Sequence, residues 1–116
     1  GPFVNDQRRL HVIFRNLVSN AIKYQDSRDD RNSFLKIIVT STKGGTLITV
    51  EDNGIGIPEA RIEKVFDMFY RVSELSKGSG IGLYIVKETV EKLEGSITLK
   101  SEQGKGSKFE IWLPNL

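Results

Sequence analysis

The stretch DNGIGIP, residues 52–58, is the starting point from which the rest of the chain is interpreted. It follows TLITVED, residues 46–52, which predicts a strand. Gly54 and Gly56 remove side chains, so a flat ligand could lie against the backbone there. At the end of the strand, the carboxylate of Asp52 could accept a hydrogen bond from an exocyclic amine. The alternative is a tight turn in which Asp52 bonds to its own loop.

The residues on either side of this loop predict an α/β fold. Apolar residues recur at helical spacing in the first helix, which Asn5 or Asp6 would cap. Pro58 suits the first turn of a second helix, and Gly95 suits the end of the third. The expected helices are 6–24, 59–65 and 80–93. The expected strands, which form two hairpins, are 35–42, 46–52, 96–101 and 107–114. The expected core face of the first helix is Leu10, Ile13, Phe14, Leu17, Val18 and Ala21.

Composition limits the function classes. The 116 residues are expected to form one domain. A net charge of +2 spread over both signs gives no basis for binding nucleic acid or a membrane surface. The absence of cysteine excludes thiolate zinc sites and disulfides and favours the cytosol. Residues 1–5 are interpreted as a cloning remnant or linker, and the chain as a piece of a longer protein.

Three polar residues share one stripe of the first expected helix. Asn16, Asn20 and Lys23 stand at i, i+4 and i+7, so they project from the flank of its apolar face. Amide oxygens one turn apart suit Mg²⁺, which prefers oxygen ligands and keeps substrate phosphates in its shell. Lys23 could then meet a phosphate. The alternative is a solvated polar flank, which is common on amphipathic helices.

A second glycine-rich loop, GSGIGL at 78–83, opens the last expected helix. Backbone N–H groups at a helix N-terminus bind phosphate, and the helix dipole favours the anion. A dinucleotide fingerprint would need a glycine where the chain has Leu83. Upstream, FDMFYR at 66–71 ends in Arg71, which is a candidate for contact with a terminal phosphate, and Lys77 is a second candidate.

Taken in order, NLVSNAIKY, DNGIGIP, FDMFYR and GSGIGLYIVK resemble the N, G1, F and G2 boxes of the catalytic and ATP-binding (HATPase) domain of sensor histidine kinases. The resemblance runs from about Asp6 to Leu113. It implies the Bergerat fold, a two-layer α/β sandwich with a mixed, mostly antiparallel sheet on one layer of about three helices. The whole chain, 1–116, is then one such domain, and residues 71–80 match the ATP lid.

The family assigns roles to the matching residues. Its metal-ligating asparagine falls on Asn20, while Asn16 and Lys23 match neighbours that help to hold metal and phosphates. Tyr24 matches an aromatic residue beside the nucleotide, and Asp52 matches the aspartate that reads the adenine amine. The implied catalytic residues are Asn16, Asn20 and Arg71. The implied nucleotide site comprises Asn16, Asn20, Lys23, Tyr24, Asp52, Gly54, Gly56, Ile57, Arg71, Lys77, Gly78, Ser79, Gly80, Ile81, Gly82 and Leu83.

The same fold serves DNA gyrase B subunits, heat-shock chaperones and mismatch-repair ATPases. Those enzymes hydrolyse ATP with a glutamate one turn before the metal asparagine. Here that position is Asn16, whose amide cannot act as a general base. The resemblance therefore favours a kinase over an ATPase.

The implied reaction transfers the γ-phosphoryl group of ATP, held with Mg²⁺, to a histidine on a separate dimerisation and phosphoacceptor domain of the same parent. The single histidine of this chain, His11, is not expected to replace that acceptor. A response regulator is the expected downstream partner, and the parent is expected in the cytoplasm or anchored in the inner membrane. Two alternatives remain open: a catalytically degenerate nucleotide-binding or docking module, and a serine kinase of the anti-sigma-factor type.

Overall fold

The computed structural model describes residues 2–23, 33–67 and 82–114. The elements in chain order are α1 (Pro2–Lys23), β1 (Leu35–Ser41), β2 (Gly45–Asp52), the 3₁₀ helix η1 (Glu59–Lys64), α2 (Gly82–Lys92), β3 (Ser96–Glu102) and β4 (Gly106–Pro114). Their order is the one expected from the sequence. None of the helices in these ranges has the length and apolar character needed to span a bilayer.

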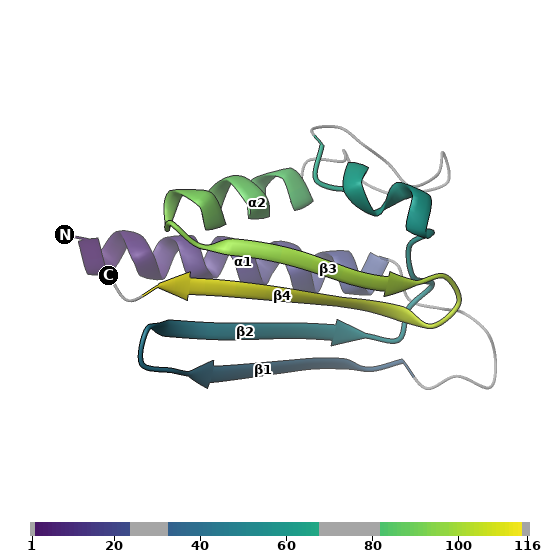
Figure 1. Cartoon of the computed structure of the whole chain (residues 1–116), viewed down its shortest axis with the longest axis horizontal. Coiled ribbons are helices and arrows are strands. Elements are labelled where there is room, and N and C mark those ends of the chain that lie inside the picture. Colours follow the sequence, from purple (N-terminus) through teal and green to yellow (C-terminus); the bar gives the residue numbers. More distant parts are fainter. Residues whose placement is uncertain (1, 24–32, 68–81, 115–116) are drawn as a thin grey trace.

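The four strands form one sheet in the order β1-β2-β4-β3. Two hairpins meet at its centre, where β2 pairs with β4, so that Val50 lies opposite Phe109 and Asp52 opposite Ser107. Figure 1 shows α1 and α2 together on one face of this sheet. The predicted two-layer sandwich is confirmed. Every strand pair within the described ranges is antiparallel, so the mixed character expected of the sheet is not seen there.

A single apolar core lies between the helices and the sheet. In α1, the predicted core residues Ile13, Leu17 and Ala21 are buried, and Leu10 and Phe14 pack against them. Alternation along the strands turns every second side chain toward the helices. The sheet and α2 contribute Ile48, Val50, Val86, Val90, Leu93, Phe109 and Ile111 to this core.

The C-terminus of α2 ends in a left-handed turn. The N–H of Gly95 donates to the carbonyl of Val90, and the N–H of Glu94 donates to that of Glu91. This is the Schellman arrangement, in which glycine usually takes the left-handed position. Here Glu94 takes it, with φ of 62°. Gly95 is glycine for another reason, because a Cβ there would lie 2.1 Å from the carbonyl oxygen of Trp112.

The outer strand β1 is exposed along its whole length. Ile37 lies opposite Val50 and Val39 opposite Ile48, so both belong to the helix-facing side of the sheet. They are nevertheless exposed, Val39 by 58%. Ile38, on the opposite side of the same strand, is exposed as well. The helices therefore do not cover this edge of the sheet.

Two local predictions need correction. Asn5 and Asp6 do not cap α1, because the helix already begins at Pro2, where proline suits the first helical position. The short helix after Pro58 is a 3₁₀ helix. Phe66 of the FDMFYR segment contacts Phe109 edge to face, with ring centroids 6.2 Å apart. His11 lies on the surface.

Candidate functional site

The N-box asparagine of α1 meets the start of α2. The side-chain nitrogen of Asn16 donates to the carbonyl of Val12, one turn back, at 2.8 Å. This bond turns the amide oxygen away from Val12, and that oxygen lies 3.3 Å from the position that a Cβ would take on Gly82. Asn20 follows one turn later and is half-buried. An amide oxygen is thus presented to the first residue of α2, where backbone N–H groups lack helical partners.

At the end of β2, Asp52 carries the charge of the DNGIGIP loop. Its register places it in line with the buried Ile48 and Val50, on the helix-facing side of the sheet. Its Oδ1 accepts a hydrogen bond from the N–H of Gly54 at 2.8 Å. Burial raises the pKa of this carboxyl above its ordinary value of 3.8. Backbone N–H bonds from Gly54 and Ser107 oppose the rise, and Glu51 adds to it.

The loop after Asp52 packs directly against the turn between β3 and β4. The N–H of Gly104 donates to the carbonyl of Ile55 at 2.7 Å, and the N–H of Ile57 donates to Ser101 Oγ at 2.8 Å. Between them, Gly56 has φ of 74°, and a Cβ on it would lie 2.1 Å from the carbonyl oxygen of Glu102. This contact accounts for the second glycine of the motif within the fold itself.

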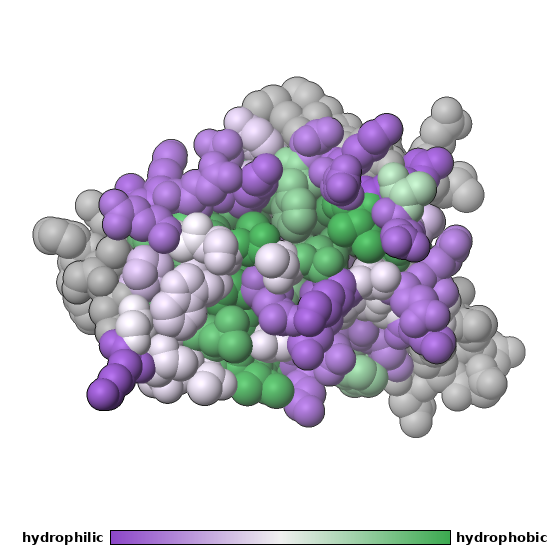
Figure 2. Space-filling model, in the orientation of Figure 1, coloured by the Kyte–Doolittle hydropathy of each residue, from purple (hydrophilic) through white to green (hydrophobic). Residues whose placement is uncertain are grey.

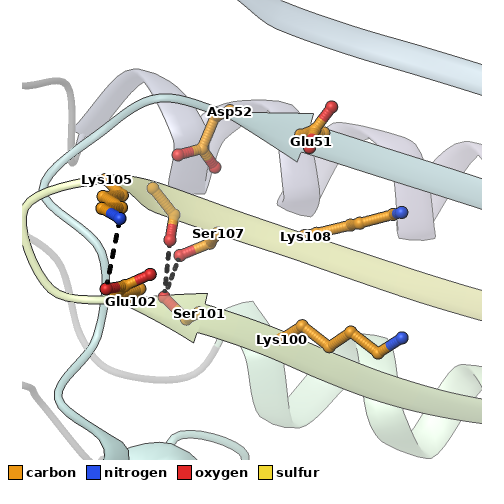
Figure 3. Close-up of a pocket in the computed structure, with 9 residues that line it drawn as sticks. Glu51, Asp52, Lys100, Ser101, Glu102, Lys105, Ser107 and Lys108 are labelled. Carbon is orange, nitrogen blue, oxygen red and sulfur yellow. Dashed lines mark hydrogen bonds and ion pairs between the residues drawn. The ribbon is translucent and has the colours of Figure 1, made fainter.

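A pocket of about 350 Å³ opens at this end of the sheet, beside Asp52 (Figure 3). Its rim is charged. Lys105 forms an ion pair with Glu102 at 3.5 Å, and Lys100 pairs with Glu110, outside the pocket, at 3.2 Å. Figure 2, drawn in the orientation of Figure 1, shows hydrophilic residues near the end of the sheet where β4 begins, with some hydrophobic residues among them. The remaining residues that line the pocket are Glu51, Ser101, Gly106, Ser107 and Lys108.

Among the described residues of the predicted boxes, the structure places Asn16 of α1 beside Gly82 at the start of α2, and it holds the loop from Asp52 to Ile57 against the turn between β3 and β4. Leu83 packs against the core. The side chain of Lys23 lies outside the described residues. So do Tyr24, Arg71, Lys77, Gly78, Ser79, Gly80 and Ile81.

Two serines beside Asp52 were missed by the sequence analysis. Ser101 and Ser107 lie opposite each other on β3 and β4, and their hydroxyl oxygens are 2.7 Å apart. Ser107 is buried. The signal was present, because polar residues interrupt the apolar face that Leu99 and Phe109 continue.

The described side chains also limit the kind of metal site. Among them, no group of three or more His, Cys, Asp or Glu residues is placed to hold a metal ion. Asn16 and Asn20 each carry an amide oxygen, a type of ligand that Mg²⁺ accepts while it keeps water and phosphate in its shell.

Known proteins resemble this chain in sequence and in fold. The family model of histidine kinase-, DNA gyrase B-, and HSP90-like ATPases matches residues 5–116. The autoinducer 2 sensor kinase/phosphatase LuxQ of Vibrio vulnificus is 43% identical over 94% of this chain, which spans 13% of that protein. The sensor protein RprX of Bacteroides fragilis is 39% identical over 98% of this chain, which spans 22% of it. The chain therefore spans only a small part of these relatives.

Solved structures agree in fold. The mycobacterial sensor histidine kinase MprB superimposes with a TM-score of 0.77 at 28% identity, over 92% of this chain and 70% of that one. Full-length ShkA in complex with AMPPNP gives a TM-score of 0.75 at 23% identity, over 92% of this chain and 22% of that one, and supports the fold alone.

Proposed function

This chain belongs to the family of histidine kinase-, DNA gyrase B- and HSP90-like ATPases, in its sensor histidine kinase branch, and on that premise we propose that it binds Mg²⁺-ATP and donates the γ-phosphoryl group to a histidine of a separate domain. The transfer breaks the bond between the γ-phosphorus and the β–γ bridging oxygen, forms a phosphorus–nitrogen bond to the acceptor imidazole, and leaves ADP. Catalysis of this kind depends mainly on positioning and charge neutralisation.

The observation that carries the proposal is the approach of Asn16 to Gly82. It joins the helix of the N box to the first turn of α2, which follows the second glycine-rich loop. A phosphate chain bound at the N-terminus of α2 would then lie within reach of the amide oxygens of α1.

Asp52 supports the choice of adenine. A carboxylate at the end of β2 accepts a hydrogen bond from an exocyclic amine, whereas the carbonyl that guanine carries at the corresponding position would be repelled. The bonds from Gly54 and Ser107 hold the carboxylate in one orientation. Because the loop is packed on the β3–β4 turn, this orientation is set before a ligand arrives.

The residues that would bind the metal ion lie on α1. Asn20 would ligate Mg²⁺, with Asn16 as its neighbour one turn earlier, and the bound ion would neutralise phosphate charge. Asn16 holds its amide nitrogen on Val12 and offers only an oxygen to the site. An amide oxygen does not abstract a proton from water, so hydrolysis of ATP is disfavoured and the phosphoryl group is kept for the acceptor.

Arg71, Lys77 and Lys23 complete the proposal as cations that would face the phosphates. The acceptor histidine would lie on a dimerisation domain of the same parent, and a response regulator would receive the phosphoryl group next. We do not assign the acceptor role to His11, which is exposed on α1.

Calorimetric titration with ADP and with ATP, each with and without Mg²⁺, tests nucleotide binding. We expect binding of both, tighter with Mg²⁺ for ATP, and loss of at least a factor of ten in Asp52→Asn. Phosphoryl transfer is tested separately by adding a purified phosphoacceptor domain of a sensor histidine kinase and [γ-³²P]ATP. Failure of the intact chain to bind either nucleotide would overturn the proposal, and binding without transfer would restrict it to a nucleotide-binding module.

A further inference from the structure

Ser101 stands where three segments meet. It lies near the end of β3, directly before the turn that leads to β4. Its Oγ is 2.8 Å from the backbone nitrogen of Ile57, 2.9 Å from the carbonyl oxygen of Gly106 and 2.7 Å from Ser107 Oγ. Figure 3 shows the last two contacts beside Asp52. One hydroxyl thus joins the DNGIGIP loop to the first two residues of β4.

The number of hydrogen bonds that a hydroxyl can donate and accept limits how these three contacts are made. A serine hydroxyl has one proton to donate and two lone pairs to accept with. The N–H of Ile57 must be a donor, so it uses one lone pair of Ser101. The single proton of Ser101 then goes either to the carbonyl of Gly106 or to Ser107. In the first case Ser107 donates to Ser101. In the second case Ser107 accepts from Ser101, and the hydroxyl proton of Ser107 points toward another acceptor.

The two segments that Ser101 joins are the same two that hydrogen-bond to Asp52. One backbone N–H comes from Gly54 in the loop, and the other from Ser107 on β4. The bond from Ile57 to Ser101 holds the far end of that loop, and the bond between the hydroxyls holds Ser107. Ser101 is therefore hydrogen-bonded to both of the segments that donate to Asp52.

We propose that Ser101 is a positioning residue for nucleotide recognition: its hydroxyl ties the DNGIGIP loop to β4 so that the N–H groups of Gly54 and Ser107 converge on Asp52. This inference rests on the proposed function, because it takes Asp52 as the group that reads the adenine amine. Without the hydroxyl, the loop keeps its bond from Gly104 to Ile55. It loses the attachment at Ile57, beyond Gly56, so the segment that carries the N–H of Gly54 is held less tightly against β4.

The test compares Ser101→Ala with Ser96→Ala, a matched control on the other end of β3, where Ser96 is exposed. The probe is ADP, titrated calorimetrically between pH 4 and 8. We expect Ser101→Ala to bind ADP about five- to tenfold more weakly, as loss of one buried hydrogen bond predicts. We also expect the pH midpoint of binding to move upward, because weaker N–H donors stabilise the carboxylate less. Ser96→Ala should match the wild type in both.

A purely structural role for Ser101 would lower the melting temperature and leave the pH midpoint of ADP binding in place, and that result would overturn the inference. If the alanine variant does not fold, Ser101→Cys decides, since it keeps the side-chain volume with poor hydrogen bonding. ADP binding by Ser101→Cys with wild-type affinity and midpoint would refute the positioning role. Failure of the wild-type chain to bind ADP would instead refute the proposed function, so the two failures are distinguishable.

Discussion

The side-chain oxygen of Asn16 lies 3.3 Å from the position of a missing Cβ on Gly82. The asparagine cannot simply rotate away, because its nitrogen is bonded to the carbonyl of Val12. Gly82 therefore leaves room for an oxygen that its own helix directs toward α2. The contact links two parts of the chain that are far apart in sequence. A substitution that changes the spacing between Asn16 and Gly82 therefore tests the proposed metal and phosphate site.

Gly82→Ala should reduce nucleotide binding without unfolding the protein. The added methyl group would push the Asn16 oxygen by a few tenths of an ångström, and we expect ATP affinity in Mg²⁺ to fall roughly three- to tenfold. Alanine favours helix, so the melting temperature should not drop. Gly44→Ala is the control, because its Cβ would meet Trp112 at an ordinary 3.7 Å. Unchanged ATP affinity in Gly82→Ala would mean that the spacing has no role in binding.

Asp52→Asn should separate stability from function. The pKa of Asp52 is raised in the folded protein, so ionisation of this carboxyl costs folding free energy above its ordinary pKa of 3.8. Asparagine still accepts the bond from Gly54 and carries no charge. We expect a melting temperature equal to or above that of the wild type at pH 7, together with weaker ADP binding.

The stability difference in Asp52→Asn should shrink as the pH falls through and below 3.8, because the wild-type carboxyl becomes protonated first in the folded state and then in the unfolded state. Thermal melts of both proteins across this range check the sign. A variant clearly less stable than the wild type at pH 7 would show that the hydrogen bonds from Gly54 and Ser107 outweigh the cost of burial.

Gly56 and Gly104 allow the energetic cost of a positive φ to be separated from the cost of a steric contact. Both have positive φ, 74° and 85°, but a Cβ on Gly56 would meet the Glu102 carbonyl at 2.1 Å, while one on Gly104 would meet nothing within 4 Å. Gly104→Ala should cost about 1 kcal/mol of unfolding free energy, from φ alone. Gly56→Ala should cost about 3–5 kcal/mol, because overpacking is added. Urea denaturation measures both, and equal losses would contradict the role of the contact.

Glu94→Gly should stabilise the protein. Glycine adopts the left-handed conformation at the end of α2 without the steric cost that Glu94 bears, which corresponds to about 1 kcal/mol and a melting temperature higher by roughly 4 °C. Glu91→Gly, inside α2, is the control and should destabilise by about 1 kcal/mol. ADP binding should be unaffected by either change. A lower melting temperature in Glu94→Gly would show that the glutamate side chain makes a compensating contact.

The sequence predicted the elements that have one buried face. In β4, apolar and polar residues alternate clearly because one face of the strand, with Phe109 and Ile111, is buried. In the same way, the helical spacing of Ile13 and Leu17 defines the side of α1 that faces the core. A local capping preference is worth only about 1 kcal/mol. The helix start at Pro2, ahead of Asn5 and Asp6, therefore was not fixed by that preference.

The details that escaped prediction depend on contacts between distant segments. Gly95 was taken as the usual residue of a helix end, but its lack of a side chain serves the approach to Trp112, and Glu94 carries the left-handed turn instead. The role of Ser101 follows only once the β3–β4 hairpin is seen against the DNGIGIP loop. The glycines and acid of that loop predicted the candidate site, whereas Ser101, the residue proposed to position the loop, lies on another strand.

The uncovered edge of β1 has a consequence for how the protein behaves at high concentration. An outer strand that pairs only with β2 among the described residues, and whose side chains include Ile37, Ile38 and Val39, offers backbone groups and apolar contacts to a neighbouring molecule. Such edges are templates for strand addition and aggregation. We therefore expect the exposed strand β1 to limit the solubility of the isolated chain. Val39→Lys should raise the solubility of the chain while leaving the nucleotide site intact.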